Sequence, residues 1–437
     1  MHRLLFAFLL CTVQAIANSG GNVPLSAKPE LPLPVRCDSC RYPVVMVHGF
    51  LASGDTWASF QQMFAANGYS TGLLFVFDWN TLSPTSNHAV LLDAFIDQVL
   101  AKTGAAKVRL IGHSAGGGLG YSYLSDAGRA AKVDSYVHIG SMPQSGPAGP
   151  DGSVPTLNIW SADDKVARSG TIPGATNIQL NGADHYQVAT SEAAFEAVWA
   201  FFHPQLSGTS AVDPEAVVNI AGKVLYFGEN RPLANARVDI FQLDPVSGAR
   251  LNAEPFQSLS SDSLGCWGPV RVDSSGVYEF VAASPDPGGR KVHYFREKFR
   301  HSNPLVYLRA IPPPASFAGF LLKGLPDTDS QAVLTVFSAS RAVVYGRDSL
   351  IIAGKVVSDA GFASAEKTAI AWFFYDDGDN RTTLTPVGMF NDFPFLNGVD
   401  MCFPTAEEAT IPLVFNGRVL NVRNIKSSDG IVVAVFN

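Results

Sequence analysis

The stretch KVRLIGHSAGGGLGYSYL, residues 107–124, decides the fold of this chain. Residues 107–111 form a short apolar run that predicts a buried strand, and residues 119–124 continue as an apolar helix. Between them, small residues surround Ser114 at the point where the strand must turn into the helix. A serine on a strained strand-turn-helix junction has an exposed hydroxyl, which is the arrangement that a nucleophile needs.

The G-x-S-x-G spacing alone is a weak signal, because 39 of the 437 residues are glycine. Its surroundings make it specific. Upstream, the apolar strand VVMV (residues 44–47) ends in HGFL (residues 48–51). An oxyanion hole needs one backbone N–H from the residue after the nucleophile and one from a loop after an earlier strand. These donors are predicted to be the N–H groups of Ala115 and Phe50.

An acid and a base follow in the order that a hydrolase requires. The strand TLNIW (residues 156–160) leads into SADDKV, and a later strand leads into GADHY, residues 182–186. We therefore predict Ser114 as nucleophile, His185 as general base and Asp163 as the carboxylate that orients the imidazole. Asp163 is preferred because it follows the strand end most closely and Val166 can anchor its loop. Asp164 is the alternative, whereas the side chain of Asp184 should point away from the neighbouring ring.

Hydrophobic periodicity divides the chain into two halves. Apolar strands alternate with helical stretches between residues 43 and 202, which predicts a parallel sheet with helices on both faces. Beyond residue 216 the pattern changes to period two, as in IVVAVF (residues 431–436), which indicates β-strands. We predict a catalytic domain over 18–203, a linker over 204–216, and an all-β half of two sandwiches, 217–315 and 316–437.

The N-terminus predicts secretion. Residues 1–17 combine a basic start, the apolar run 4–10 and a small-residue end, which is typical of a cleaved signal peptide. The protein is thus expected outside the cell, or in the periplasm of a Gram-negative source. Four cysteines remain, and in this setting Cys37 and Cys40 predict a local disulfide. Cys266 and Cys402 are then left for each other, although four cysteines allow three connectivities.

Charge and composition exclude several classes of partner. Without Arg3 the mature chain has 30 basic and 38 acidic residues, a net charge of −8. This balance opposes nucleic acid as a main partner, and no later segment is long enough to span a membrane. No cofactor is expected. The acidic run 376–379 lacks the spacing and the distal glutamate of a calcium loop, so we interpret it as a hairpin turn and predict no metal site. The oligomeric state stays open.

The chain resembles the secreted α/β-hydrolase lipases and carboxylesterases that have a β-rich C-terminal lipid-binding region, a family that includes an archaeal long-chain lipase. The resemblance rests on VVMVHGF (44–50), LIGHSAG (110–116), TNIQLNGADHYQVATSEAAF (176–195) and, more loosely, HYFREKF (293–299). It implies hydrolysis of lipid carboxylesters, with Ser114, His185, Phe50 and Ala115 matching the family's roles, and peripheral lipid contact through the C-terminal half. Residues 217–315 also resemble a transthyretin-like or carboxypeptidase-regulatory sandwich.

Two departures from that family matter. Some relatives place the acid after the preceding strand, but IGSM (residues 139–142) has no carboxylate, which moves the role to Asp163. No helical lid is inserted before the elbow, so access to the site is expected to be open, with segment 141–153 as a flap at most. Two other enzyme classes compete, a polyesterase and a short-chain esterase. A surface-binding protein with an inactive hydrolase domain is the non-enzymatic alternative.

Overall fold

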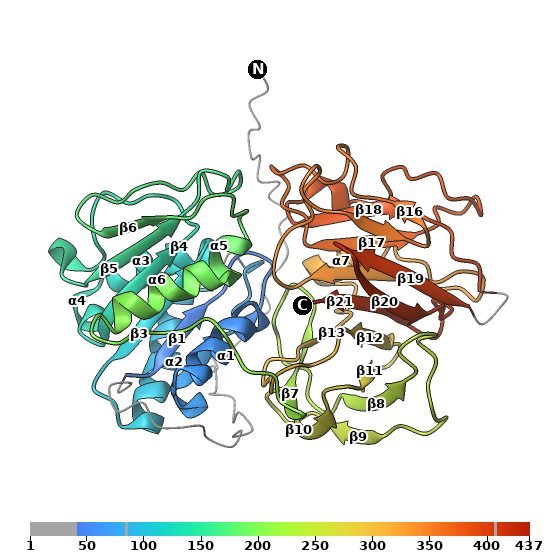
Figure 1. Cartoon of the computed structure of the whole chain (residues 1–437), viewed down its shortest axis with the longest axis horizontal. Helices are drawn as coiled ribbons and strands as arrows, with labels where there is room; N and C mark the ends of the chain where they lie inside the picture. The colour runs from blue at the N-terminus through green and yellow to red at the C-terminus, as the bar shows by residue number, and fades with distance from the viewer. Residues whose placement is uncertain (1–41, 84–85, 406–408) are drawn as a thin grey trace.

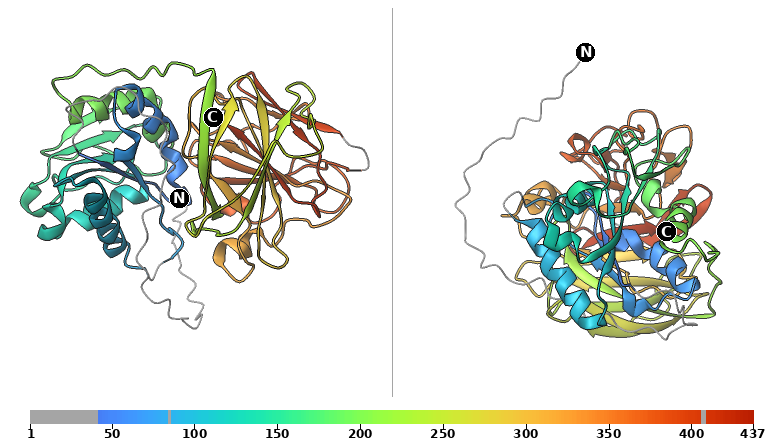
Figure 2. Two further views of the ribbon diagram at one scale, coloured as in Figure 1. Left: turned by 90° about the horizontal axis from the view of Figure 1, so that it is seen from below. Right: turned by 90° about the vertical axis from the view of Figure 1, so that its left-hand side faces the viewer.

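The computed structural model describes residues 42–83, 86–405 and 409–437. The chain forms two halves that lie side by side, an α/β half and a β-rich half (Figure 1). Residues 204–216 contain no helix or strand and cross from one half to the other (Figure 2). The expected signal peptide and the Cys37–Cys40 pairing lie outside the described residues.

The first half is built on a parallel sheet of six strands in the order β2-β1-β3-β4-β5-β6. Each predicted strand of this half is present, within a few residues of its expected bounds. The strands are β1 (Val44–Val47), β2 (Leu74–Phe77), β3 (Val108–His113), β4 (Val133–Ile139), β5 (Thr156–Trp160) and β6 (Thr176–Gln179). Parallel neighbours place their carboxyl ends at one edge of the sheet, and a site is expected in the loops there.

Helices cover both faces of this sheet. Val44 and Met46 of β1 pack against α1 (Ala58–Ala66) and α6 (Glu192–Phe202), whereas Val45 and Val47 pack against α2 (His88–Thr103) and α3 (Ala115–Leu124). Successive residues of a strand point to opposite faces, so a continuous apolar run such as VVMV is what a sheet buried on both sides needs. Short helical turns complete this half: η1 (Gly54–Trp57), η2 (Thr71–Leu73), α4 (Ala127–Ala130), η3 (Pro150–Gly152) and α5 (Gln187–Thr190).

In the described residues, the second half consists of three β-sheets, one short α-helix and one 3-10 turn. A three-stranded sheet has the order β10-β7-β13, an eight-stranded sheet β18-β17-β14-β21-β12-β11-β8-β9, and a four-stranded sheet β16-β15-β19-β20. The elements are β7 (Val217–Tyr226), β8 (Arg237–Leu243), β9 (Gln257–Ser260), β10 (Cys266–Asp273), β11 (Val277–Ala283), β12 (Val292–Arg296), β13 (Leu308–Ala310), α7 (Phe317–Leu322), β14 (Leu334–Ser338), β15 (Leu350–Ile352), β16 (Lys355–Val356), β17 (Ala371–Tyr375), η4 (Phe390–Asp392), β18 (Leu396–Asp400), β19 (Thr410–Phe415), β20 (Arg418–Arg423) and β21 (Ile431–Phe436). The predicted class, an α/β half followed by an all-β half, is confirmed.

The predicted division into two separate sandwiches is wrong. The eight-stranded sheet takes strands from both sides of the expected boundary at residue 315, and β12 pairs in parallel with β21 at its centre. Along β21, Val433 and Val435 face the core shared with the three-stranded sheet, whereas Val432 and Phe436 face the core shared with the four-stranded sheet. One sheet is therefore the middle layer of a three-layer half, because both of its faces are apolar.

Polar contacts join the two halves. Asp78, at the carboxyl end of β2, accepts hydrogen bonds from Lys223 Nζ at 2.7 Å and Tyr307 Oη at 2.9 Å, both in the β-rich half. Arg309 pairs with Asp55 at 2.7 Å. The amide of Asn230 donates to the carbonyl oxygens of Ala52 at 2.7 Å and Trp79 at 3.0 Å. Each of these contacts holds a loop at the carboxyl edge of the parallel sheet.

The expected pairing of Cys266 with Cys402 is not formed. Cys266 begins β10 in the three-stranded sheet, whereas Cys402 follows β18 at the far edge of the eight-stranded sheet. A disulfide needs its two Cα atoms within about 7 Å of each other. These two cysteines belong to different sheets and do not pair. Among the helices of the described ranges, none has both the length and the hydropathy to span a bilayer.

Candidate active site

Ser114 lies on a strained turn between β3 and α3. Its backbone has φ 54° and ψ −121°, a conformation that a non-glycine residue adopts only where the surroundings enforce it. The surroundings are close: a Cβ on Gly116 would lie 2.5 Å from the carbonyl oxygens of Val47 and His48. Only glycine lets α3 approach β1 this closely. The G-x-S-x-G pattern thus reflects packing as well as chemistry.

Three side chains form a hydrogen-bonded chain at this turn. His185 Nε2 lies 2.9 Å from Ser114 Oγ, and His185 Nδ1 lies 2.8 Å from Asp164 Oδ2. The histidine is buried, with 2 % of its surface exposed, and Ser114 is half-buried. Because Nδ1 faces a carboxylate, it carries the proton, which leaves Nε2 free to accept the serine hydroxyl proton.

The predicted acid, Asp163, is replaced by its neighbour Asp164. Asp163 is exposed, and its carboxylate accepts the backbone N–H of Gly182 at 2.8 Å rather than facing His185. The chain turns between Ser161 and Asp164, so the second aspartate of the pair points inward. The sequence argument correctly chose the loop after β5 but the wrong residue of an adjacent pair.

Local hydrogen bonds hold Asp164 in its charged form. Its Oδ1 accepts the N–H groups of Val166 at 2.9 Å and Ala167 at 3.0 Å. Burial alone would raise the pKa of Asp164, but the bond from His185 and these two N–H groups outweigh it, so the pKa lies below its usual value. Val166 therefore anchors this loop, although to Asp164 rather than to Asp163.

The two predicted oxyanion donors flank Ser114. A Cβ on Gly49 would lie 3.0 Å from Ser114 Cβ, so the loop bearing Phe50 passes directly beside the nucleophile. Within the described ranges, neither the N–H of Phe50 nor that of Ala115 donates to a loop or side-chain acceptor. The N–H of Leu51, the residue after Phe50, donates to Thr81 Oγ1 at 3.0 Å. Two free N–H groups beside a serine suit a developing negative charge. Their role as the oxyanion hole stays a prediction.

His113 contacts His185 and helps to fix its position. Its Nε2 donates to the backbone carbonyl of His185 at 2.8 Å, and the two rings lie 4.9 Å apart. Burial, together with the neighbouring His185, lowers the pKa of His113 to about 3. The ring is therefore neutral at physiological pH and acts as a positional support, not as a second base.

The β-rich half contributes a wall of the site that the sequence did not reveal. The ring of Phe395 stacks on His185, with centroids 5.6 Å apart and an interplanar angle of 16°. Beside it, Arg347 pairs with Asp184 at 2.7 Å and donates to Gln187 at 2.7 Å, so both flanks of His185 are tied to the second half. No local sequence pattern indicates such contacts, because their partners lie far apart along the chain.

Access to the site differs from the expectation. The described residues between β2 and α2 contain no helix. His185 is nevertheless covered, because Phe395 from the other half lies over it. Segment 141–153, expected as a flap, contacts the turn that bears the nucleophile, because Ser141 Oγ donates to the carbonyl of Ser114 at 2.8 Å.

One acidic cluster within the described ranges has the spacing of a metal site. Oxygen atoms of Asp376, Asp377 and Asp400 lie within 4.8 Å of one another. Asp376 already accepts the N–H groups of Gly378 at 2.9 Å and Arg381 at 3.0 Å, and Asp400 accepts that of Asp377 at 3.1 Å. These bonds hold the cluster within the loop that follows β17. The expected hairpin turn is wrong, because β17 and the next strand, β18, pair in parallel.

Comparisons with known proteins agree with this geometry. Residues 42–151 match the model of the alpha/beta hydrolase fold, and residues 216–313 match that of the lipase C-terminal domain. A triacylglycerol lipase of Burkholderia plantarii is 31% identical over 24% of this chain and 31% of its own. One of Pseudarthrobacter phenanthrenivorans is 35% identical over 18% of this chain and 26% of its own. The matched segments thus span less than a third of these relatives.

Solved structures resemble part of the chain at low identity. A lipase from Bacillus licheniformis shares 16% identity, with a TM-score of 0.34, over 42% of this chain and 99% of its own. An esterase from a Rhodococcus species shares 17%, with a TM-score of 0.31, over 40% of this chain and 94% of its own. The family model and the sheet order together show an α/β-hydrolase fold, which is followed by a β-rich half.

Proposed function

We propose that this protein is a serine carboxylester hydrolase that acts on lipid esters. The observation behind the proposal is the unbroken hydrogen-bonded chain from Ser114 Oγ through His185 to Asp164. The strained backbone of Ser114 speaks against an inactive binding protein. Such strain costs folding free energy, and a purely structural turn does not require it.

The geometry supports a two-step reaction. Ser114 Oγ attacks the ester carbonyl while His185 Nε2 takes its proton, and the N–H groups of Phe50 and Ala115 stabilise the oxyanion. His185 then protonates the departing alcohol, which leaves an acyl group on Ser114. A water molecule, deprotonated by the same imidazole, releases the carboxylic acid. Asp164 stabilises the imidazolium at both steps.

Lipid esters are the favoured substrate because both curated relatives are triacylglycerol lipases and residues 216–313 match a lipase domain. We expect kcat/KM on p-nitrophenyl esters to rise from acetyl to at least octanoyl, by up to about fourfold for each methylene that reaches an apolar wall. The measurement is a chain-length profile on soluble esters together with turnover of emulsified triacylglycerol. Activity confined to acetyl and butyryl esters would make the protein a short-chain esterase, and release of acid from a polyester film would favour a polyesterase.

Lipid contact through the β-rich half is a second part of the proposal. Helix α7 exposes Phe317 and Phe320, at 53 % and 46 %, while Ala318, Leu321 and Leu322 face the core. The helix packs beside Leu51, the residue after the predicted oxyanion donor Phe50. An exposed aromatic pair next to the catalytic loops suits a lipid surface better than water.

We expect Phe317→Ser combined with Phe320→Ser to lower turnover of emulsified triacylglycerol at least about fivefold, since each substitution removes exposed apolar area that could enter a lipid layer. Turnover of a soluble butyrate ester serves as the control and should stay within about twofold. The exposed pair Val246→Ser and Leu251→Ser, away from this helix, is the matched variant. An equal loss on soluble ester would instead show a defect in folding.

Secretion is also proposed, on the N-terminal signal at residues 1–17. Recovery of activity in culture medium or periplasm, with an N-terminus near residue 18, is the observation that supports it.

A further inference from the structure

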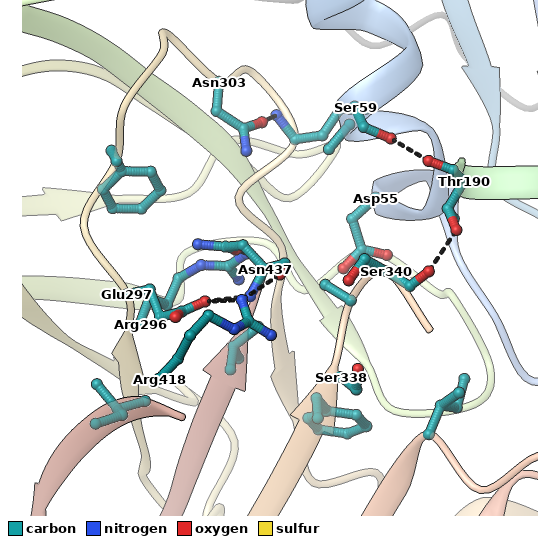
Figure 3. Close-up of a pocket in the computed structure, with 18 of the residues that line it drawn as sticks. Asp55, Ser59, Thr190, Arg296, Glu297, Asn303, Ser338, Ser340, Arg418 and Asn437 are labelled. Carbon is teal, nitrogen blue, oxygen red and sulfur yellow. Dashed lines mark hydrogen bonds and ion pairs between the residues drawn. The ribbon is translucent and has the colours of Figure 1, made fainter. Parts of the chain in front are cut away.

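A cavity of about 700 Å³ lies between the two halves. This volume falls within the range of small-molecule sites, roughly 300 to 1,000 Å³. Phe395 lines the cavity and also stacks on His185, so the cavity and the candidate active site share this residue. Figure 3 shows Arg296, Glu297, Arg418 and Asn437 gathered on one side and Asp55, Thr190 and Ser340 on the other.

Four arginines line the cavity, and two of them are neutralised by carboxylates. Arg309 pairs with Asp55 at 2.7 Å, and Arg418 pairs with Glu297 at 2.7 Å. Each of these pairs satisfies its own charge and leaves none for a ligand.

The other two arginines are Arg300, which is exposed, and Arg296, which is buried. Arg296 is 6 % exposed, yet within the described ranges no carboxylate forms an ion pair with it. Its guanidinium donates one hydrogen bond, to Asn437 Oδ1 at 3.0 Å, and its Nε is buried without a partner. Burial lowers its pKa to about 10, so the group is charged at physiological pH. The carboxylates of Asp55 and Glu297 favour its charged form from a distance, but neither forms an ion pair with it. A buried charge without a direct partner is costly, and the cavity beside it is where an anion can reach it.

The rest of the lining is apolar enough to hold a chain. Aromatic and aliphatic residues face the same space, among them Phe227, Leu305, Phe337, Phe395 and Leu396. The buried Arg296 suits one negative charge, and an apolar wall suits an alkyl group.

We propose that this cavity binds a carboxylate-headed amphiphile, with the carboxylate on Arg296 and Asn437 and the alkyl chain against the apolar wall. Fatty carboxylates are the products of the reaction proposed above, so the source of the ligand rests on that proposed function. Binding itself does not. A product held against Phe395, which stacks on His185, would slow turnover as it accumulates.

The test uses full-length Ser114→Ala protein, which binds without turnover, and isothermal titration with decanoate below its micelle concentration. Decanol tests the contribution of the alkyl chain without a carboxylate, and acetate tests that of the carboxylate without an alkyl chain. Decanoate is expected to bind at least about tenfold tighter than either, because a charged hydrogen bond adds about 1.5 to 3 kcal/mol to the apolar contact. Equal binding of decanoate and decanol, or no binding of decanoate, would overturn the proposal.

Substitutions place the site. Arg296→Met in the same background should bring decanoate down to the affinity of decanol, and it removes an unpaired buried charge, so the fold should tolerate it. Arg296→Lys restores the charge and should recover most of the affinity. Arg300→Gln, an exposed residue of the same lining, is the matched control and should change nothing. Unchanged decanoate binding in Arg296→Met would refute the assignment, even if that variant proved less stable.

A kinetic arm separates this proposal from the proposed function. In otherwise wild-type protein, decanoate should inhibit ester hydrolysis, and Arg296→Met should relieve that inhibition about tenfold while leaving the initial rate on butyrate ester unchanged. A protein that binds decanoate through Arg296 but hydrolyses no ester would refute the esterase function alone. An active esterase whose inhibition ignores Arg296 would refute the binding site alone.

Discussion

Ser114→Ala is expected to abolish ester hydrolysis while the protein stays folded. Removal of a nucleophile of this type lowers kcat by roughly 10⁴- to 10⁶-fold, because the oxyanion donors and the binding site alone give only weak catalysis. The fold should survive because Ser114 Oγ hydrogen-bonds only to His185 in the described structure, and its loss leaves no buried donor without a partner.

The measurement is kcat on a p-nitrophenyl ester, with circular dichroism and Tm as the checks on folding. Ser141→Ala is a matched control, since that hydroxyl donates to the backbone carbonyl of Ser114 but contacts none of the three catalytic side chains. Residual turnover within about tenfold of wild type in a folded Ser114→Ala protein would refute the assignment of the nucleophile.

Asp164→Asn should be the second most damaging change, with kcat lowered by about 10³- to 10⁴-fold. An amide at this position can donate to Nδ1 of His185, which favours the wrong tautomer and no longer stabilises the imidazolium. KM should change little, because Asp164 is buried behind His185.

Asp163→Asn is the matched control at the neighbouring position. Asparagine keeps an oxygen for the N–H of Gly182, so kcat should stay within about twofold of wild type. The pair of variants therefore decides between two adjacent carboxylates by kinetics alone. Equal losses in both would indicate that the loop, not one carboxylate, is what the reaction needs.

The contacts between the halves change how the β-rich half should be viewed. Phe395 covers His185, and Arg347 ties down Asp184 beside it. Removal of residues 217–437 would therefore expose the candidate site and release the loop that bears its histidine. Point variants in the full chain separate substrate contact from stability more cleanly than truncation does.

Local sequence determined the elbow, the strands of the parallel sheet and the place of His185. Each of these depends on residues within a few positions of one another: an apolar run long enough for a buried strand, small residues where a turn must be tight, and a polar residue where the strand ends. The apolar, β-branched run of β21 likewise indicated a strand from its own six residues, although it is buried on both faces and does not alternate.

Tertiary structure decided the rest. Whether Asp163 or Asp164 reaches His185 depends on the direction of one turn, and adjacent residues of the same type leave no difference in pattern. The shared eight-stranded sheet, the unpaired Cys402 beside β18 and the stacking of Phe395 on His185 arise from partners that are distant along the chain. Periodicity shows that a strand is buried on two faces, but only packing of the whole chain selects what covers each face.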